Sequence, residues 1–282
     1  MASIVLALAA SVAWGVGDFL GGMASRQRSV LTVLLLSQAV GLLIVAPAVA
    51  LSGQPPVEGA ARLSAIGGSV AGLVGVAALY RAIAVGVASI AAPISATGAA
   101  IPVAVGLFRG EPTSGAHLAG VALALLGVVL AAASAHGPAS PHLSRMPHEG
   151  VAFALLAAAG FGVFFVLLHD ASLYSVLWAT FLQRLTSVGL LAALVLITRP
   201  SLRVGLRAGG GLVAIGVLDQ GANILYGFAS TLGLVSLAAV LASLFPIVTV
   251  MLARLVLHER IARTQQIGVG CALLGVALIA AQ

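Results

Sequence analysis

The sequence predicts an all-α membrane protein of ten transmembrane helices, arranged as two inverted five-helix repeats. Three observations predict this fold class. Hydrophobic residues make up 61% of the 282 residues and charged residues only 7%, whereas a soluble domain carries roughly 25% charged residues. Ten apolar runs follow one another, and each is close to the roughly 20 residues that cross a bilayer. Stretches of the first half of the chain also recur in the second half.

The ten apolar runs give the order of the elements. The first run begins without a basic segment, unlike a cleavable signal peptide, so we expect it to stay as the first helix. The longest connection contains three prolines, which is typical of a linker. It divides the chain into a first five-helix repeat at 1–134, a linker at 135–149 and a second repeat at 150–282. The runs cover residues 2–22, 30–51, 64–85, 89–108, 115–134, 150–168, 174–197, 210–231, 235–256 and 264–281.

The internal repeat is clearest near the end of each half. Residues 124–128 and 272–276 both read Ala-Leu-Leu-Gly-Val, 148 positions apart, and Glu111 matches Glu259 at the same offset. Because each half has an odd number of helices, we expect the second half to enter the membrane from the opposite side. Inverted repeats of this kind are typical of secondary transporters, whose substrate site lies near the midplane between the repeats.

The basic residues are all arginine and lie mostly in short loops, which favours helix orientation in a membrane over nucleic-acid binding. The loops on the side of both termini carry Arg62 and Arg109. The positive-inside rule therefore places the opposite, arginine-rich side in the cytoplasm and the termini outside. The other side carries Arg26, Arg28, Arg81, Arg145, Arg199, Arg203, Arg207, Arg254, Arg260 and Arg263.

Catalytic and cofactor motifs are missing from the sequence. It contains no His-Glu-x-x-His, no Gly-x-Ser-x-Gly and no phosphate-binding loop, so we predict neither an enzyme nor an ATP-driven pump. One cysteine, Cys271, and scattered histidines predict no disulfide, metal or cofactor. The weaker alternative is a membrane-embedded aspartyl protease, because residues 15–18 read Gly-x-Gly-Asp and Asp219 offers a second aspartate. The order of these two elements is the reverse of that in such proteases.

Charge is costly inside apolar runs and marks a candidate functional site, and three charged residues are the candidates here. They are Asp18, Arg184 and Asp219. Antiparallel neighbouring helices place Arg184 and Asp219 at comparable depth. The two side chains either pair with each other or bind the charged ends of a zwitterionic substrate, and an ion pair that only fixes helix packing is equally consistent with the pattern. Asp18 or Asp219 could also bind a coupling proton.

The remaining polar residues of the runs complete the candidate site. Asp219, Asn223, Tyr226 and Ser230 follow one helix face, which we expect to point into the bundle. Trp14, Tyr80 and Tyr226 could form an aromatic wall. Glu111 and Glu259 follow apolar runs directly, and we expect each to cap the helix that comes next. The candidate substrate-binding residues are Trp14, Asp18, Gln38, Tyr80, Gln183, Arg184, Asp219, Asn223 and Tyr226.

Each half ends in a similar block, made of a proline-containing helix, a glutamate in the next loop and a glycine-rich helix. The blocks are Pro102…Gly110-Glu111…Gly120…Leu125-Leu126-Gly127 and Pro246…His258-Glu259-Arg260…Gly268…Leu273-Leu274-Gly275, and the first helix contains Trp14-Gly15. With these motifs the chain resembles the EamA family of the drug/metabolite transporter superfamily. One departure is that the two prolines are 144 positions apart, not 148.

The resemblance implies a ten-helix carrier in the cell (inner) membrane, working without ATP by alternating access. It implies export or import of small polar metabolites, often amino acids. We expect export, and a small-drug or cation proton antiporter of the same superfamily is the alternative. The partners implied are a small-molecule substrate, with proton coupling left open, and the lipid bilayer, but no nucleic acid. The oligomeric state stays open between monomer and homodimer. The family is usually drawn with both termini inside, against the arginine count, so the orientation also stays open.

Overall fold

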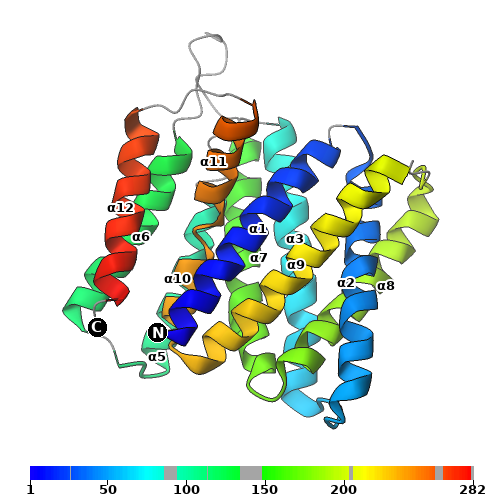
Figure 1. Cartoon of the computed structure of the whole chain (residues 1–282), viewed down its shortest axis with the longest axis horizontal. Coiled ribbons are helices and arrows are strands. Elements are labelled where there is room, and N and C mark those ends of the chain that lie inside the picture. Colours follow the sequence, from blue (N-terminus) through cyan, green and yellow to red (C-terminus); the bar gives the residue numbers. More distant parts are fainter. Residues whose placement is uncertain are drawn as a thin grey trace.

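In the computed structural model, the apolar runs form helices that stand side by side as a bundle (Figure 1). The structure describes residues 1–25, 27–85, 94–112, 114–133, 148–202, 206–257 and 263–280. Within these ranges all regular elements are helices and there is no strand. The prediction of an all-α protein is confirmed.

The helices follow the predicted runs closely. The first half contains α1 (Ala2–Ser25), α2 (Val30–Ser52), α3 (Gly59–Val85), the short 3-10 helix η1 (Thr97–Ala99), α5 (Ala100–Phe108) and α6 (Gly115–Ala133). The second half contains α7 (His148–Ser172), α8 (Val176–Thr198), α9 (Leu206–Leu232), α10 (Val235–Ala242), α11 (Phe245–Leu257) and α12 (Arg263–Ala280). The predicted linker 135–149 lies outside the described residues except for His148 and Glu149, which already belong to α7.

The ninth run is built from two helices, and the described part of the fourth run passes from the 3-10 helix η1 into α5. The ninth is divided into α10 and α11 by a turn at Ser243 and Leu244. Pro246 lies in the first turn of α11, and Pro102 lies in the first turn of α5. A proline is tolerated there because the first backbone N–H groups of a helix have no intrahelical acceptor. Pro246 therefore marks where the ninth run restarts as a helix, and Pro102 follows the change from η1 to α5.

Six of the helices are long and apolar enough, by length and composition, to cross a membrane. The other apolar helices of the described chain are shorter. The spans are Ala2–Ser25, Val30–Ser52, Gly59–Leu79, Glu149–Ser172, Val176–Thr198 and Gly209–Leu232.

The helices of the two halves pack in a reciprocal pattern. The first helix of each half packs on the third helix of the other half, as α1 on α9 and α7 on α3. The second, fourth and fifth helices pack on their own counterparts, as α2 on α8, α5 on α10 and α6 on α12 (Figure 1). Exchanging the two halves leaves this pattern unchanged.

The repeated five-residue segment packs on its own copy where α6 crosses α12. A Cβ added at Gly127 would lie 2.7 Å from both the Ala272 Cα and the Gly268 carbonyl oxygen. A Cβ added at Gly275 would lie 2.5 Å from the Ala124 backbone nitrogen and 2.7 Å from the Gly120 oxygen. Later residues of each helix meet earlier residues of the other, so the two helices run antiparallel. The backbones approach closely because these positions carry no side chain.

The start of α1 and the end of α12 lie at the same end of the bundle (Figure 1). We call this the terminal end and the opposite one the arginine-rich end. Several contacts join the two halves at the terminal end. The Ser3 hydroxyl donates to the Ala229 carbonyl at 2.7 Å, and Arg109 forms an ion pair with Asp170 through two N–O distances of 2.5 and 3.0 Å. The hydrogen bonds to Asp170 raise the pKa of the Arg109 guanidinium, which keeps this contact charged.

Glu111 also joins the halves at the terminal end. Its carboxylate accepts the backbone N–H of Val235 at 2.5 Å and that of Ser236 at 3.3 Å, and so caps the buried helix α10. The prediction that Glu111 caps the helix that follows it is wrong. The carboxylate lies over Gly106, where an added Cβ would be 2.7 Å from the Glu111 Cδ atom, and so it reaches α10, which packs on α5. Glu259 lies outside the described residues.

Removing this cap should destabilise the protein. Glu111→Ala is expected to cost about 0.5–2 kcal/mol of folding free energy, because the first N–H groups of α10 lose their acceptor in a buried place. Gly106→Ala should lower stability in the same direction, because its methyl group displaces the carboxylate. Thermal unfolding of the purified protein in detergent measures both effects. Glu58→Ala, in an exposed connection, is the control, and a Glu111→Ala protein as stable as this control would contradict the capping role.

Candidate substrate-binding site

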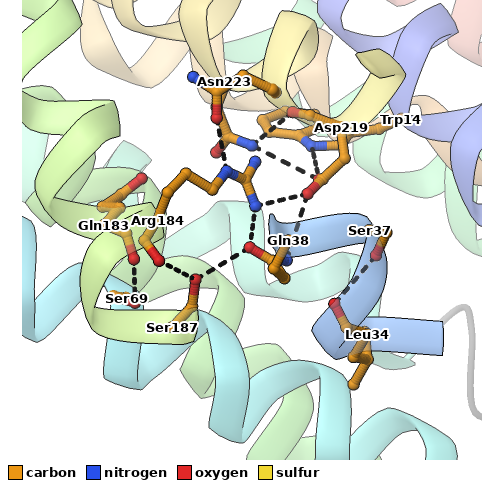
Figure 2. A network of polar contacts seen from close by, with 11 residues as sticks. Trp14, Leu34, Ser37, Gln38, Ser69, Gln183, Arg184, Ser187, Asp219 and Asn223 are labelled. Atoms are coloured by element: carbon orange, nitrogen blue, oxygen red, sulfur yellow. Dashed lines mark hydrogen bonds and ion pairs between the residues drawn. The ribbon is translucent and has the colours of Figure 1, made fainter. Parts of the chain in front are cut away.

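Four helices bring polar side chains together halfway along their lengths (Figure 2). Trp14 lies near the middle of α1, Gln38 of α2, Arg184 of α8 and Asp219 of α9. In helices that cross a membrane, these positions fall near the centre of the bilayer. Polar and charged groups at that depth need partners within the protein.

The centre of the site is an ion pair between α8 and α9. The Arg184 Nη1 atom lies 2.7 Å from the Asp219 Oδ2 atom, and the two side chains are 7% and 28% exposed. The sequence left open whether these residues pair with each other, and the structure shows that they do. Breaking such a pair by removing one partner leaves an uncompensated charge, which is strongly destabilising.

Gln38 bridges both members of the ion pair from α2. Its amide oxygen accepts hydrogen bonds from Arg184 Nη1 and from the Ser187 hydroxyl, the latter at 3.0 Å. Its amide nitrogen donates to Asp219 Oδ2 at 3.3 Å. From α1, the Trp14 indole N–H donates to Asp219 Oδ1 at 3.2 Å. Two helices of the first half therefore hold the charged pair of the second half in place.

Gln220 is a member of the site that the sequence reasoning missed. Its amide oxygen accepts a hydrogen bond from Arg184 Nε at 2.5 Å, and the residue is 1% exposed. Gly41 of α2 packs against both side chains, since an added Cβ there would lie 3.1 Å from Arg184 Nε and 3.4 Å from the Gln220 Cβ atom. A polar residue inside an apolar run was the available signal, but Gln220 falls outside the stripe of Asp219, Asn223 and Tyr226.

Asp18 lies beside this network without joining it. It is exposed, although Ser11, Trp14 and Gly21 on the same face of α1 are buried. Its carboxylate interacts electrostatically with that of Asp219. Asp219 is already paired with a guanidinium, whereas an aspartyl protease needs two carboxylates that share one proton. The geometry therefore does not match the protease alternative.

The predicted stripe along α9 points into the bundle, so that prediction is confirmed. Asn223 is buried and donates to the Asp219 backbone oxygen at 2.6 Å. Tyr226 is fully buried, and its hydroxyl donates to the Phe165 carbonyl at 3.0 Å. These two residues support the Asp219 segment of α9 and fix it against α7.

The predicted aromatic wall is formed in part. The rings of Trp14 and Tyr226 lie 6.0 Å apart, and Phe165 packs on both at 5.7 and 4.9 Å. Phe164 adds a further contact to Trp14 at 6.2 Å. Both phenylalanines look like ordinary apolar residues of a span, so nothing in the sequence marks them as part of the site. The side chain of Tyr80 lies outside the described part of the structure.

Gln183 faces α3 instead of the ion pair. A Cβ added at Gly68 of α3 would lie 3.0 Å from its amide nitrogen, and its backbone oxygen accepts a hydrogen bond from Ser69 at 2.8 Å. Neighbouring residues of a helix point about 100° apart, so Gln183 and Arg184 contact different helices. The structure therefore does not bring Gln183 into the network. Among the described residues, no three or more His, Cys, Asp or Glu side chains gather as a metal site would require.

Comparisons with known proteins bear on the family and the fold. The model of a family described as the EamA-like transporter family matches residues 1–133 and 148–281. A solved crystal structure matches this chain with a TM-score of 0.80. The match covers 98% of this chain and 95% of that chain, at 18% sequence identity. At this identity the likeness shows a shared fold alone. A search of curated proteins finds no match.

Proposed function

Because the chain belongs to the EamA-like transporter family, and is therefore a multi-pass membrane transporter of the drug/metabolite transporter superfamily, we propose that it is a secondary carrier that exports small polar metabolites such as amino acids. One observation carries the proposal. The Arg184–Asp219 pair lies halfway along its helices, at the depth where carriers built from repeats bind their substrates, and Asp219 is still partly exposed.

The cargo binds by exchanging partners with the ion pair. A zwitterion offers a carboxylate to Arg184 and an ammonium group to Asp219, so that neither protein charge is left unpaired when the pair opens. Trp14, Gln38 and Asn223 hold Asp219 in position through their hydrogen bonds. A cargo with only one charge would leave one of the two residues uncompensated in a medium of low dielectric constant.

Transport proceeds by alternating access between two inverted repeats. The reciprocal packing of the halves and the antiparallel crossing of α6 and α12 support this arrangement. The contacts of Ser3, Arg109 and Glu111 with the second half support a conformer that is closed at the terminal end. Asp18 lies one turn from Trp14 toward the arginine-rich end and is exposed, which supports access from that side.

A small-cation antiporter of the same superfamily is the second candidate. Asp18 and Asp219 place two carboxylates beside a single guanidinium, and this balance favours one added positive charge. A proton on Asp18 or Asp219 would serve as the coupling ion in such an exchange. The two candidates differ in whether the cargo itself carries a negative group.

Metabolite profiling tests the proposed function. Cells that produce the parent protein should release one or a few amino acids above the level of cells with an empty vector, and Asp219→Asn should return the medium to that level. Thr186→Val is the matched control, because its hydroxyl bonds only to the Leu182 carbonyl of its own helix among the described residues. Equal release by the parent and Asp219→Asn, at equal amounts in the membrane, would contradict the proposal. Resistance to cationic compounds without amino-acid release would favour the second candidate.

A further inference from the structure

Two buried hydrogen-bond donors at the centre of the site have no acceptor among the described residues. They are the Nη2 group of Arg184 and the amide nitrogen of Gln220. The two residues are only 5% and 1% exposed. Buried polar groups nearly always have a partner, and an unsatisfied donor costs free energy of the order of a lost hydrogen bond. Such groups in a binding site are candidates for contacts with a ligand.

The two donors lie next to each other. The guanidinium is planar, and its Nε and Nη2 groups share one edge. The Nε group donates to the Gln220 amide oxygen at 2.5 Å, which fixes the orientation of that amide and leaves its NH₂ group as the free end. The opposite end of the guanidinium is occupied, because Nη1 contacts both Gln38 and Asp219. The two unpaired groups are therefore both hydrogen-bond donors, and they lie on the side of Arg184 that faces Gln220.

We infer that Arg184 Nη2 and the Gln220 amide nitrogen together bind a carboxylate group of the cargo, so that Gln220 determines specificity for cargo with a carboxylate. This inference rests on the proposed function and deepens it. A carboxylate presents two acceptor oxygens and suits a pair of donors, one of them charged. A carboxylate adds less negative charge beside Asp219 and Asp18 than a dianionic phosphate does, and the ammonium group of a zwitterionic cargo offsets that single charge.

The packing of α2 explains how cargo reaches the two donors. Gly41 of α2 lies against both Arg184 and Gln220. The helix α2 belongs to the first half, whereas α8 and α9 belong to the second. Movement of the first half against the second would therefore open the space beside both residues, and the cargo's ammonium group would meet Asp219, the neighbour of Gln220 on α9.

The variant Gln220→Glu separates this role from a merely structural one. It keeps an oxygen to accept the hydrogen bond from Arg184 Nε, but it replaces the free donor by a second carboxylate oxygen. A residue that only holds Arg184 in place tolerates this change. A residue that donates to the cargo does not, and the loss of a charge-assisted hydrogen bond should weaken binding by about tenfold or more.

The experiment measures thermal unfolding of the full chain in lipid nanodiscs with three probes. These are an equimolar mixture of L-amino acids, the matching mixture of their primary amides and a mixture of aminoalkylphosphonic acids. The parent protein and Thr186→Val should be stabilised by the amino acids and not by the amides. Gln220→Glu should unfold near the parent temperature without probe and lose the response to amino acids.

Several outcomes overturn the inference. Amides that stabilise as well as acids, phosphonates that stabilise better than acids, no response to any mixture, or an unchanged response of Gln220→Glu each contradict it. Failure of the proposed function is distinguishable from these. If metabolite profiling finds release of a solute without a carboxylate that depends on Asp219, the chain is a carrier and only the carboxylate site is wrong.

Discussion

Arg184→Ala is expected to abolish transport and to destabilise the protein by about 3–5 kcal/mol, the range for losing one partner of a buried ion pair. The substitution leaves Asp219 without its guanidinium and Gln220 without the donor to its amide oxygen. It also removes a donor to Gln38. Unfolding in detergent measures the stability, and release of amino acids from cells measures the transport.

A double variant separates the two parts of this expectation. Replacing a whole buried ion pair by apolar residues of similar size is often neutral for stability or better. Arg184→Met combined with Asp219→Leu should therefore recover most of the stability lost in Arg184→Ala while transport stays absent. If the double variant transported normally, the pair would serve helix packing alone. If Arg184→Ala itself were stable and active, the ion pair would be needed neither for stability nor for transport.

Gly127→Ala is the second large effect. Its methyl group would meet the backbone of α12 at Ala272 and Gly268, which no rotamer change relieves. Overpacking of this kind costs about 1–3 kcal/mol, and contact with backbone atoms places the expected loss at the upper end. Gly275→Ala should give a matching loss, because it meets the backbone of α6 at Ala124 and Gly120 in the same way.

Gly270→Ala is the matched control, on α12 with Gly275. No atom of the described residues lies within 4 Å of an added Cβ there, and alanine is the better helix former by about 1 kcal/mol. We expect its unfolding temperature to equal or exceed that of the parent. A Gly127→Ala protein as stable as Gly270→Ala would contradict the close crossing of α6 and α12.

The helices were predictable from the sequence because apolar length in a membrane is a strong physical constraint. Each of the ten predicted runs is helical over most of its described residues, and apart from the break in the ninth run only the ends differ. The division of the ninth run at Ser243 was harder to predict, because Pro246 is compatible either with a kinked helix or with the start of a new one. The partner of Glu111 could not be read from its own neighbourhood, because the capped helix lies 124 residues away in the chain.

The charged residues of the site were predictable from the sequence, whereas one of its neutral polar residues was not. Arg184 and Asp219 stand out because charged residues in a span need a reason. Gln38 and Trp14 were found as polar or amphipathic residues at similar depth. Gln220 was missed because a helix-face pattern selects every third or fourth residue, while a long arginine side chain reaches the neighbour of its ion-pair partner. Gln183 was predicted as part of a polar stripe of its run with Thr180 and Ser187, although it contacts α3.

The crossing of α6 and α12 restricts which substitutions the two halves can accept during evolution. Gly127 packs against residues 268 and 272, and Gly275 packs against residues 120 and 124. Each half therefore contributes the same patch, made of a glycine and the two backbone positions that the other glycine contacts. In an oligomer such a contact would be isologous, with one patch that is complementary to itself. A larger side chain at position 127 must be compensated at 268 or 272 and gains nothing from a change at 275. A chain that fused two copies of either half would carry this contact unaltered.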